Sequence, residues 1–64
     1  MRPNSFDTLV SIFDASRDQD TRRHILDYLG MSRDPRAGQK LFSIAQSDPD
    51  PDLRRTAVDF IAFR

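Results

Sequence analysis

Apolar residues recur at helical spacing in four segments of this chain. In the first segment, Phe6, Leu9, Val10 and Phe13 fall at positions i, i+3, i+4 and i+7, which form one face of an α-helix. Similar faces follow in three later segments, and no segment shows the sustained alternation of a half-buried strand. The pattern predicts an all-α fold with four helices, over about residues 5–15, 19–29, 35–46 and 51–63.

Aspartates mark the expected helix starts. Asp34-Pro35 and Asp50-Pro51 each place a capping carboxylate before a proline at the first helical position, where the missing N–H costs nothing. Asp18 is the predicted cap of the second helix, and Gly30 is placed to end that helix in a left-handed conformation. The connections are short, so each helix should fold back antiparallel on the one before it.

The second half of the chain repeats the first with a period of 32 residues. The positions at which this shift brings identical residues together are Pro3/Pro35, Leu9/Leu41, Ser11/Ser43, Ile12/Ile44, Asp18/Asp50, Asp20/Asp52, Arg22/Arg54, Arg23/Arg55 and Asp27/Asp59. They include the cap, the basic pair and part of the apolar face. A period in this range indicates stacked supersecondary units. We therefore expect a single domain over 1–64, with one repeat at about 3–32 and the other at about 35–64.

The stretch from Asp48 to Ala57, Asp-Pro-Asp-Pro-Asp-Leu-Arg-Arg-Thr-Ala, resembles the turn and second helix of the HEAT-like repeats of the PBS-lyase type. The first copy departs from this pattern at Ser16, Thr21 and Ile25, which stand where an aspartate, an aliphatic residue and an alanine are typical. The resemblance implies an α-solenoid of two stacked antiparallel helical hairpins, in which the second helix of each lines the concave side. It says little about function, because such repeats serve many unrelated roles.

The amino-acid composition argues against several classes of function. The ten basic and ten acidic residues cancel, whereas a dedicated nucleic-acid binder usually carries a basic surplus. The chain has no cysteine and one histidine, which excludes a disulfide framework and a cysteine-based zinc site. No apolar run approaches the roughly 18 residues of a membrane span, and the N-terminus lacks the apolar core of a signal peptide. We expect a cytoplasmic protein without a membrane segment.

The basic pairs Arg22-Arg23 and Arg54-Arg55 lie in the first turns of helices, where the helix dipole disfavours positive charge. The structural interpretation is that an arginine of one repeat bridges to a carboxylate in a neighbouring turn, with i, i+4 pairs added along each helix. The candidate acceptors are Asp18, Asp20, Asp50 and Asp52, and the i, i+4 pairs are Arg23–Asp27 and Arg55–Asp59. The functional interpretation is a pair of guanidinium forks for phosphate or for a partner's carboxylates. The interleaved aspartates would repel phosphate, which favours the structural interpretation.

Two further groups resemble sites but are better explained without one. The acidic turn from Asp48 to Asp52 lacks the spacing, the glycine and the distal glutamate of an EF-hand, and caps and prolines account for its residues. His24 and Tyr28 are i, i+4 neighbours, but no nucleophile or acid accompanies them. We expect no catalytic, cofactor-binding or metal-binding residue.

Two repeats leave both ends of a stack open, whereas solenoids normally need three or more repeats with polar capping units. The leading hypothesis is therefore a non-enzymatic protein–protein interaction or scaffold module that self-associates or belongs to a longer repeat array. The expected partner-binding residues are Arg22, Arg23, Asp27, Arg54, Arg55 and Asp59. The expected self-association residues are Phe6, Phe13, Phe60 and Phe63.

Three alternatives remain open. The first is contact with a nucleic-acid backbone through the arginine-lined second and fourth helices, against which the neutral net charge argues. The second is an enzyme, because relatives of this repeat type assist phycobilin attachment as lyases, although those chains are longer. The third is a terminal piece of a larger scaffold without activity of its own.

Overall fold

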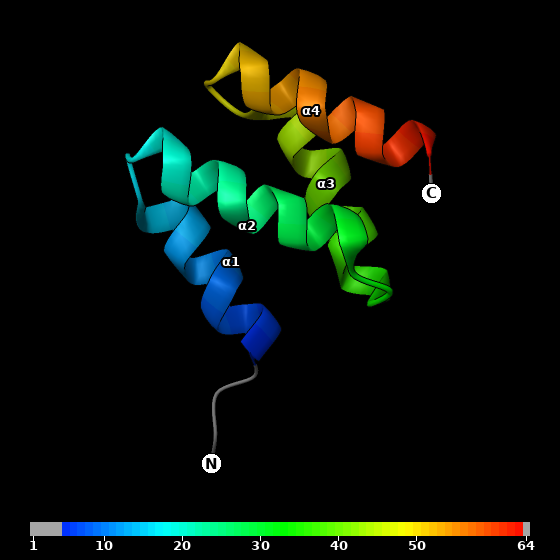
Figure 1. The fold of residues 1–64 in the computed structure, drawn as a ribbon, viewed down its shortest axis with the longest axis horizontal. Coiled ribbons are helices and arrows are strands. Elements are labelled where there is room, and N and C mark those ends of the chain that lie inside the picture. The colour runs from blue at the N-terminus through cyan, green and yellow to red at the C-terminus, as the bar shows by residue number, and fades with distance from the viewer. Residues whose placement is uncertain (1–4, 64) are drawn as a thin grey trace.

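A computed structural model describes residues 5–63 and contains four helices (Figure 1). They are α1 (Ser5–Ala15), α2 (Gln19–Met31), α3 (Pro35–Ser47) and α4 (Pro51–Ala62). The prediction of an all-α fold is confirmed, and residues 5–63 contain no strand. The helix starts agree with those expected from the caps, while the ends of α2 and α3 lie one or two residues later.

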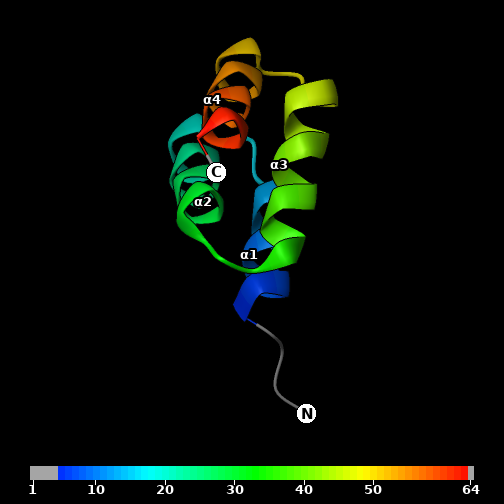
Figure 2. The same cartoon turned by 90° about the vertical axis from the view of Figure 1, so that its right-hand side faces the viewer.

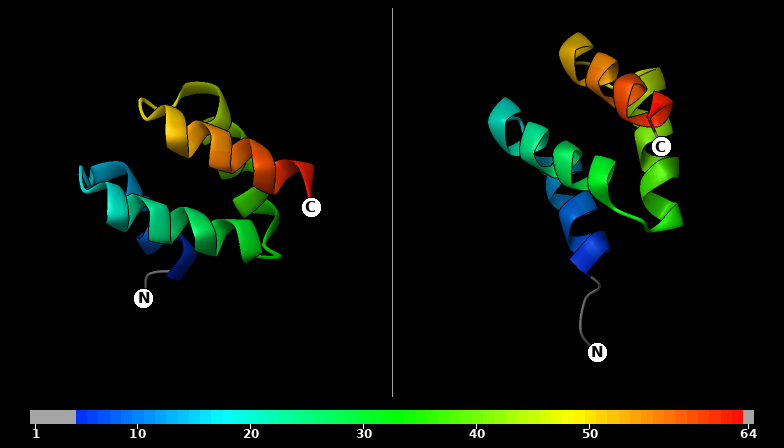
Figure 3. Two further views of the ribbon diagram at one scale, coloured as in Figure 1. Left: turned by 45° about the horizontal axis from the view of Figure 1, so that its top comes forward. Right: turned by 45° about the vertical axis from the view of Figure 1, so that its right-hand side comes forward.

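The four helices form two antiparallel hairpins, arranged in two layers. Helices α1 and α3 lie on one side, and α2 and α4 lie on the other (Figure 2). The second helices of the two hairpins run side by side, which both views in Figure 3 show. This is the arrangement expected if the repeat of 32 residues is a repeat of structure.

Side chains of the predicted capping residues hold the helix starts. The carboxylate of Asp18 accepts a hydrogen bond from the backbone N–H of Thr21 at 3.0 Å. Asp34 and Asp50 each accept from the backbone N–H two residues later, at 2.9 Å. Each bond satisfies one of the N–H groups that a helix start leaves without an intrahelical partner.

A small apolar core lies between the layers and receives side chains from all four helices. Its buried members are Phe6, Phe13, Ile25, Leu26, Leu29, Ala37, Leu41, Ile44, Leu53 and Ala57. The apolar stripes of the sequence therefore predict most of the buried positions. None of the four described helices combines the length and the apolar character that crossing a membrane requires.

Gly30 does not end its helix, which corrects the expectation of a left-handed cap. Its φ is not positive, α2 continues to Met31, and the N–H of Ser32 closes the last turn on the carbonyl of Leu29. The reason for a glycine lies in α4: a Cβ at this position would overlap the ring of Phe60. The glycine therefore allows the second helices of the two hairpins to approach closely.

We expect Gly30→Ala to lower the free energy of unfolding by about 1–3 kcal/mol, because the added methyl group must displace the Phe60 ring. Helix propensity acts in the opposite direction, by up to about 1 kcal/mol. In a Phe60→Ala background, the same substitution should therefore stabilise the chain by about 0.5–1 kcal/mol. Urea unfolding followed by circular dichroism measures both effects, and the same loss in both backgrounds would show that the close contact is not the cause.

Candidate functional site

The least exposed ion pair among residues 5–63 lies where the two hairpins meet. The guanidinium of Arg22 donates to both carboxylate oxygens of Asp48, from Nη2 to Oδ1 at 2.6 Å and from Nη1 to Oδ2 at 3.1 Å. Its Nε donates to the backbone carbonyl of Phe13 at 3.2 Å. The two side chains are only 15% and 4% exposed, so this ion pair is shielded from water. A forked pair of this kind fixes orientation as well as distance.

Arg22 also packs on an aromatic ring. Its guanidinium carbon lies 4.1 Å from the centroid of the Phe13 ring, within the range of a cation–π contact. The carbonyl that it binds belongs to the last turn of α1, where carbonyls lack intrahelical partners. One side chain of α2 therefore joins the end of α1 to the turn that precedes α4.

Asp48, the acceptor of this ion pair, also forms hydrogen bonds with three further residues. Its Oδ2 accepts from the N–H of Asp50 at 3.0 Å, its N–H donates to the carbonyl of Ile44, and its own carbonyl accepts from Nη1 of Arg54 at 2.7 Å. The carboxylate thus shapes the α3–α4 turn while it pairs with Arg22. This is the reason that a charged residue can be buried here without an unsatisfied oxygen.

The structural interpretation of the arginines therefore holds for Arg22, but the acceptor differs from the four that were expected. Asp18 and Asp50 use their carboxylates as caps, and Asp20 and Asp52 form no ion pair within residues 5–63. The acceptor is Asp48 because the stacking of the hairpins brings the α3–α4 turn against α2. The sequence signal was present: the position 32 residues earlier is Ser16, so Asp48 is one of the differences between the repeats.

The layer of α1 and α3 is joined by cations of α3 that reach carboxylates of α1. Lys40 Nζ lies 2.7 Å from Asp14 Oδ1, and Arg36 Nη1 lies 3.4 Å from Asp7 Oδ1. The same two cations lie over aromatic rings of α1, with Arg36 4.5 Å from the centroid of Phe6. These cations are therefore already paired within the chain.

Arg36 also makes a short bond beside the start of its own helix. Its Nη2 donates to Asp34 Oδ2 at 2.6 Å. This side-chain bond lowers the pKa of the Asp34 carboxyl below its ordinary value and raises the pKa of the Arg36 guanidinium. The pKa of Asp18 is lowered too, chiefly by the bond from the Thr21 hydroxyl. Both caps are thus held in the charged form that suits a helix start.

The remaining expected partner-binding residues lie on α2 and α4 with differing surroundings. Arg23 pairs with Asp27 at 3.4 Å, as the i, i+4 spacing predicts. Arg55 and Asp59 are exposed and form no ion pair with each other. His24 is exposed, and its Nδ1 lies 3.0 Å from the carbonyl of Asp20 in its own helix. Arg22 and Arg54 thus both donate to Asp48, whereas no ion pair described for residues 5–63 links the other four residues across α2 and α4.

The four phenylalanines that were expected in self-association occupy different environments. Phe6 and Phe13 are buried in the core of the chain itself, and the cationic groups of Arg36, Lys40 and Arg22 lie over their rings. Phe60 is half-buried against Gly30, and only Phe63, which is 89% exposed, presents its whole ring to solvent. Phe42 and Val58 are more exposed than any of the first three.

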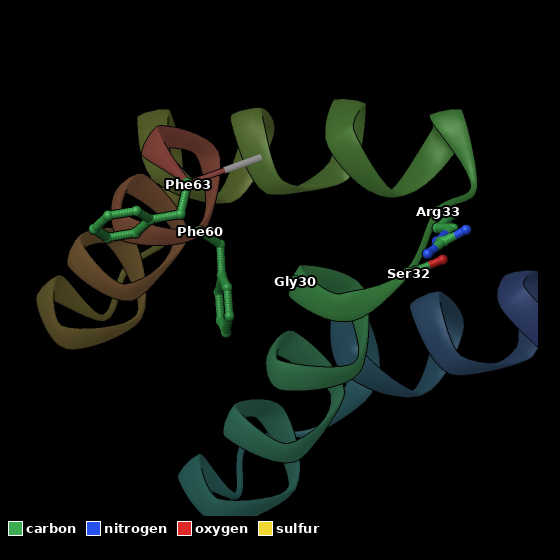
Figure 4. A pocket seen from close by; sticks show the side chains of 5 residues that line it. All are labelled: Gly30, Ser32, Arg33, Phe60 and Phe63. Atoms are coloured by element: carbon green, nitrogen blue, oxygen red, sulfur yellow. The ribbon is translucent and has the colours of Figure 1, made fainter.

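A hollow lies between the ends of α2 and α4 and is lined by Gly30, Ser32, Arg33, Phe60 and Phe63. Figure 4 shows the Phe60 ring extending toward the end of α2, while the Phe63 ring points away from it. Ser32 Oγ already accepts from the N–H of Asp34 at 3.1 Å, and the lining holds neither a histidine nor a carboxylate that could act as a base. Among the described residues, no group of three or more potential ligands that could hold a metal ion is present.

The comparisons with known proteins agree with this architecture. The family model described as HEAT repeats matches residues 2–62, which include all four helices. No curated protein and no solved structure shows significant similarity to the chain. HEAT repeats are generally scaffolds for protein interaction. Because the family model covers nearly the whole chain, this protein belongs to the HEAT repeat family.

Proposed function

We propose that this chain is a non-enzymatic protein-interaction module whose exposed apolar side chains are covered by protein, through self-association or by neighbouring repeats. The observation that carries the proposal is the exposure of large apolar side chains on the second hairpin. Phe42 of α3 is 56% exposed, Val58 of α4 is 51% exposed and Phe63 follows α4 directly. Large apolar side chains left in contact with water are candidates for contact with a protein partner, particularly where they form a continuous patch.

Charged residues of α2 and α4 would surround such an interface and contribute specificity. Arg23, Arg55 and Asp59 are exposed and Asp27 is partly so, which leaves them available to a partner. Arg22 and Arg54 are less available, because each already donates hydrogen bonds within the chain. Rim charges of this type affect partner choice and association rate more than affinity.

The pairing of the cations argues against nucleic acid as the partner. Arg22, Arg36 and Lys40 each bind a carboxylate of the same chain, and acidic residues equal basic residues in number. Phosphate binding depends on cations whose charge is not already neutralised. The surface therefore favours a protein partner with mixed charge and apolar contacts.

The test is the apparent mass of the tagged chain in an extract of its native host, measured by size-exclusion chromatography. The wild-type chain should elute in complexes above the mass of its tagged monomer, to which the chain itself contributes 7.4 kDa. A variant carrying Phe42→Ser, Val58→Ser and Phe63→Ser should elute as the monomer. The matched control carries Gln39→Ser and Gln46→Ser at exposed positions of α3, and it should behave as the wild type. Elution of the wild type as a monomer, or complexes that persist in the triple variant, would contradict the proposal.

A further inference from the structure

Helix α4 presents a stripe of exposed residues in which charges of both signs flank an apolar side chain. Arg55, Val58, Asp59 and Ala62 follow one another at positions i, i+3, i+4 and i+7, so they share one face of the helix. All four are exposed, and Val58, the large apolar residue among them, is 51% exposed. We call these four residues the α4 stripe.

The charges of the α4 stripe differ in one respect from their counterparts in α2. Arg23 and Asp27, which lie 32 residues earlier, pair with each other at 3.4 Å. Arg55 and Asp59 have the same i, i+4 spacing, yet neither forms an ion pair within residues 5–63. Both charges of α4 are therefore available to a partner.

The order of these charges makes the α4 stripe complementary to itself. Helix α4 runs from Pro51 to Ala62, and Arg55 and Asp59 lie on either side of its midpoint at nearly equal distance. When α4 of a second copy lies antiparallel along the stripe with full overlap, Arg55 of each copy meets Asp59 of the other, and the two Val58 side chains meet near the centre. A parallel arrangement would instead bring like charges together, which is unfavourable. The charge pattern therefore favours an antiparallel second copy as the occupant.

We propose that two copies of this chain associate through the α4 stripe, with their α4 helices antiparallel and related by a twofold axis. The proposal rests on the proposed function and commits to a second copy as the partner. Contact between the Val58 side chains removes apolar surface from water, and the two Arg55–Asp59 pairs set the direction and register of the helices. Phe63, whose ring is 89% exposed and points away from the end of α2 (Figure 4), lies near the start of the partner helix and extends the apolar contact. Because each copy uses the same surface, the assembly closes at two copies.

Charge reversals in the full chain test this arrangement, because the twofold axis makes their effects reciprocal. Arg55→Asp leaves only negative charges at positions 55 and 59, and Asp59→Arg leaves only positive ones. Each variant should therefore raise the dissociation constant of its own dimer at least about tenfold, since two attractive contacts become repulsive. An equimolar mixture of the two variants should recover dimers within about threefold of the wild-type dissociation constant, because both contacts are attractive again. Sedimentation equilibrium of the purified chain measures these constants.

Two control proteins separate these contacts from net charge and from folding. Arg17→Asp changes the net charge as much as Arg55→Asp does, at an exposed position between α1 and α2, and it should dimerise as the wild type does. The double variant Arg55→Asp with Asp59→Arg exchanges the charges at unchanged net charge, and it should dimerise as well. Both substitutions suit the dipole of α4, with an acidic residue nearer its start and a basic residue nearer its end, and circular dichroism checks that the variants are folded.

Three results would overturn the proposal: a purified wild-type chain that stays monomeric up to about 1 mM, dimers that the single variants leave unchanged, or a mixture of the two variants that stays monomeric. The extract experiment tests the proposed function separately, since complexes lost in the triple serine variant would support that function even if the purified chain were a monomer.

Discussion

Asp48→Asn is expected to lower the free energy of unfolding by about 3 kcal/mol, because it removes one member of a shielded ion pair and leaves the charge of the other. Asparagine can still accept the N–H of Asp50, so the turn itself should persist. Arg22, whose side chain is only 15% exposed, would keep its hydrogen bond to the Phe13 carbonyl but lose its anionic partner. Small domains have only about 5–15 kcal/mol to lose, so this variant should unfold at a visibly lower urea concentration.

Two comparisons separate this explanation from a general effect of removing a carboxylate. Asp27→Asn breaks the exposed pair with Arg23 and should cost no more than about 0.5 kcal/mol. Adding Arg22→Met to Asp48→Asn removes the buried charge while keeping an unbranched apolar chain over the Phe13 ring, and it should recover part of the lost stability. The explanation fails if the double variant is no more stable than Asp48→Asn, or if Asp27→Asn costs as much.

The helices could be predicted from the sequence because their causes are local. Apolar spacing sets the buried face, and Asp18, Asp34 and Asp50 act within two or three residues of their own positions. The match between the two halves of the sequence also predicted that two helical hairpins stack on each other. The structure bears out these features because each is written into neighbouring residues or into the period itself.

The contacts between hairpins could not be predicted in the same way, because they depend on which positions the stacking brings together. Identical residues of the two repeats drew attention to Asp18 and Asp50, whereas the acceptor of Arg22 is Asp48, whose counterpart is Ser16. Gly30 was likewise interpreted from its place near a helix end, although its reason is the Phe60 ring. Positions that differ between the repeats are thus as informative about these contacts as identical positions. Asp48 contacts the hairpin that precedes its own, and its counterpart Ser16 has no such role within the described residues.

The same reasoning explains why Phe6 and Phe13 were expected to take part in self-association. Helix α1 has apolar residues on more than one side, and a stack of two repeats was expected to leave its ends open. In the fold, long cationic side chains of α2 and α3 lie over both rings, with their charged ends on carboxylates. Arginine and lysine can cover apolar surface in this way while their charges stay paired or solvated.

Leu26→Ala should lower the free energy of unfolding by about 2–5 kcal/mol, while Val58→Ala at the corresponding position should change it by no more than about 0.5 kcal/mol. Leu26 is completely buried in the core, so its truncation leaves a cavity. Val58 already contacts water over half of its surface, and alanine is the better helix former. Urea unfolding at low micromolar concentration measures both values on the separate chain.

The comparison becomes stricter when the protein concentration is raised. If chains cover one another's apolar surfaces, Val58→Ala should become costly at high concentration, because association stabilises the folded state that it binds. Leu26→Ala should cost the same at every concentration at which the chain is a monomer. If Val58→Ala strongly lowered the free energy of unfolding of the dilute monomer, Val58 would already be covered within the chain. That result would contradict the proposal that its side chain is covered by another protein.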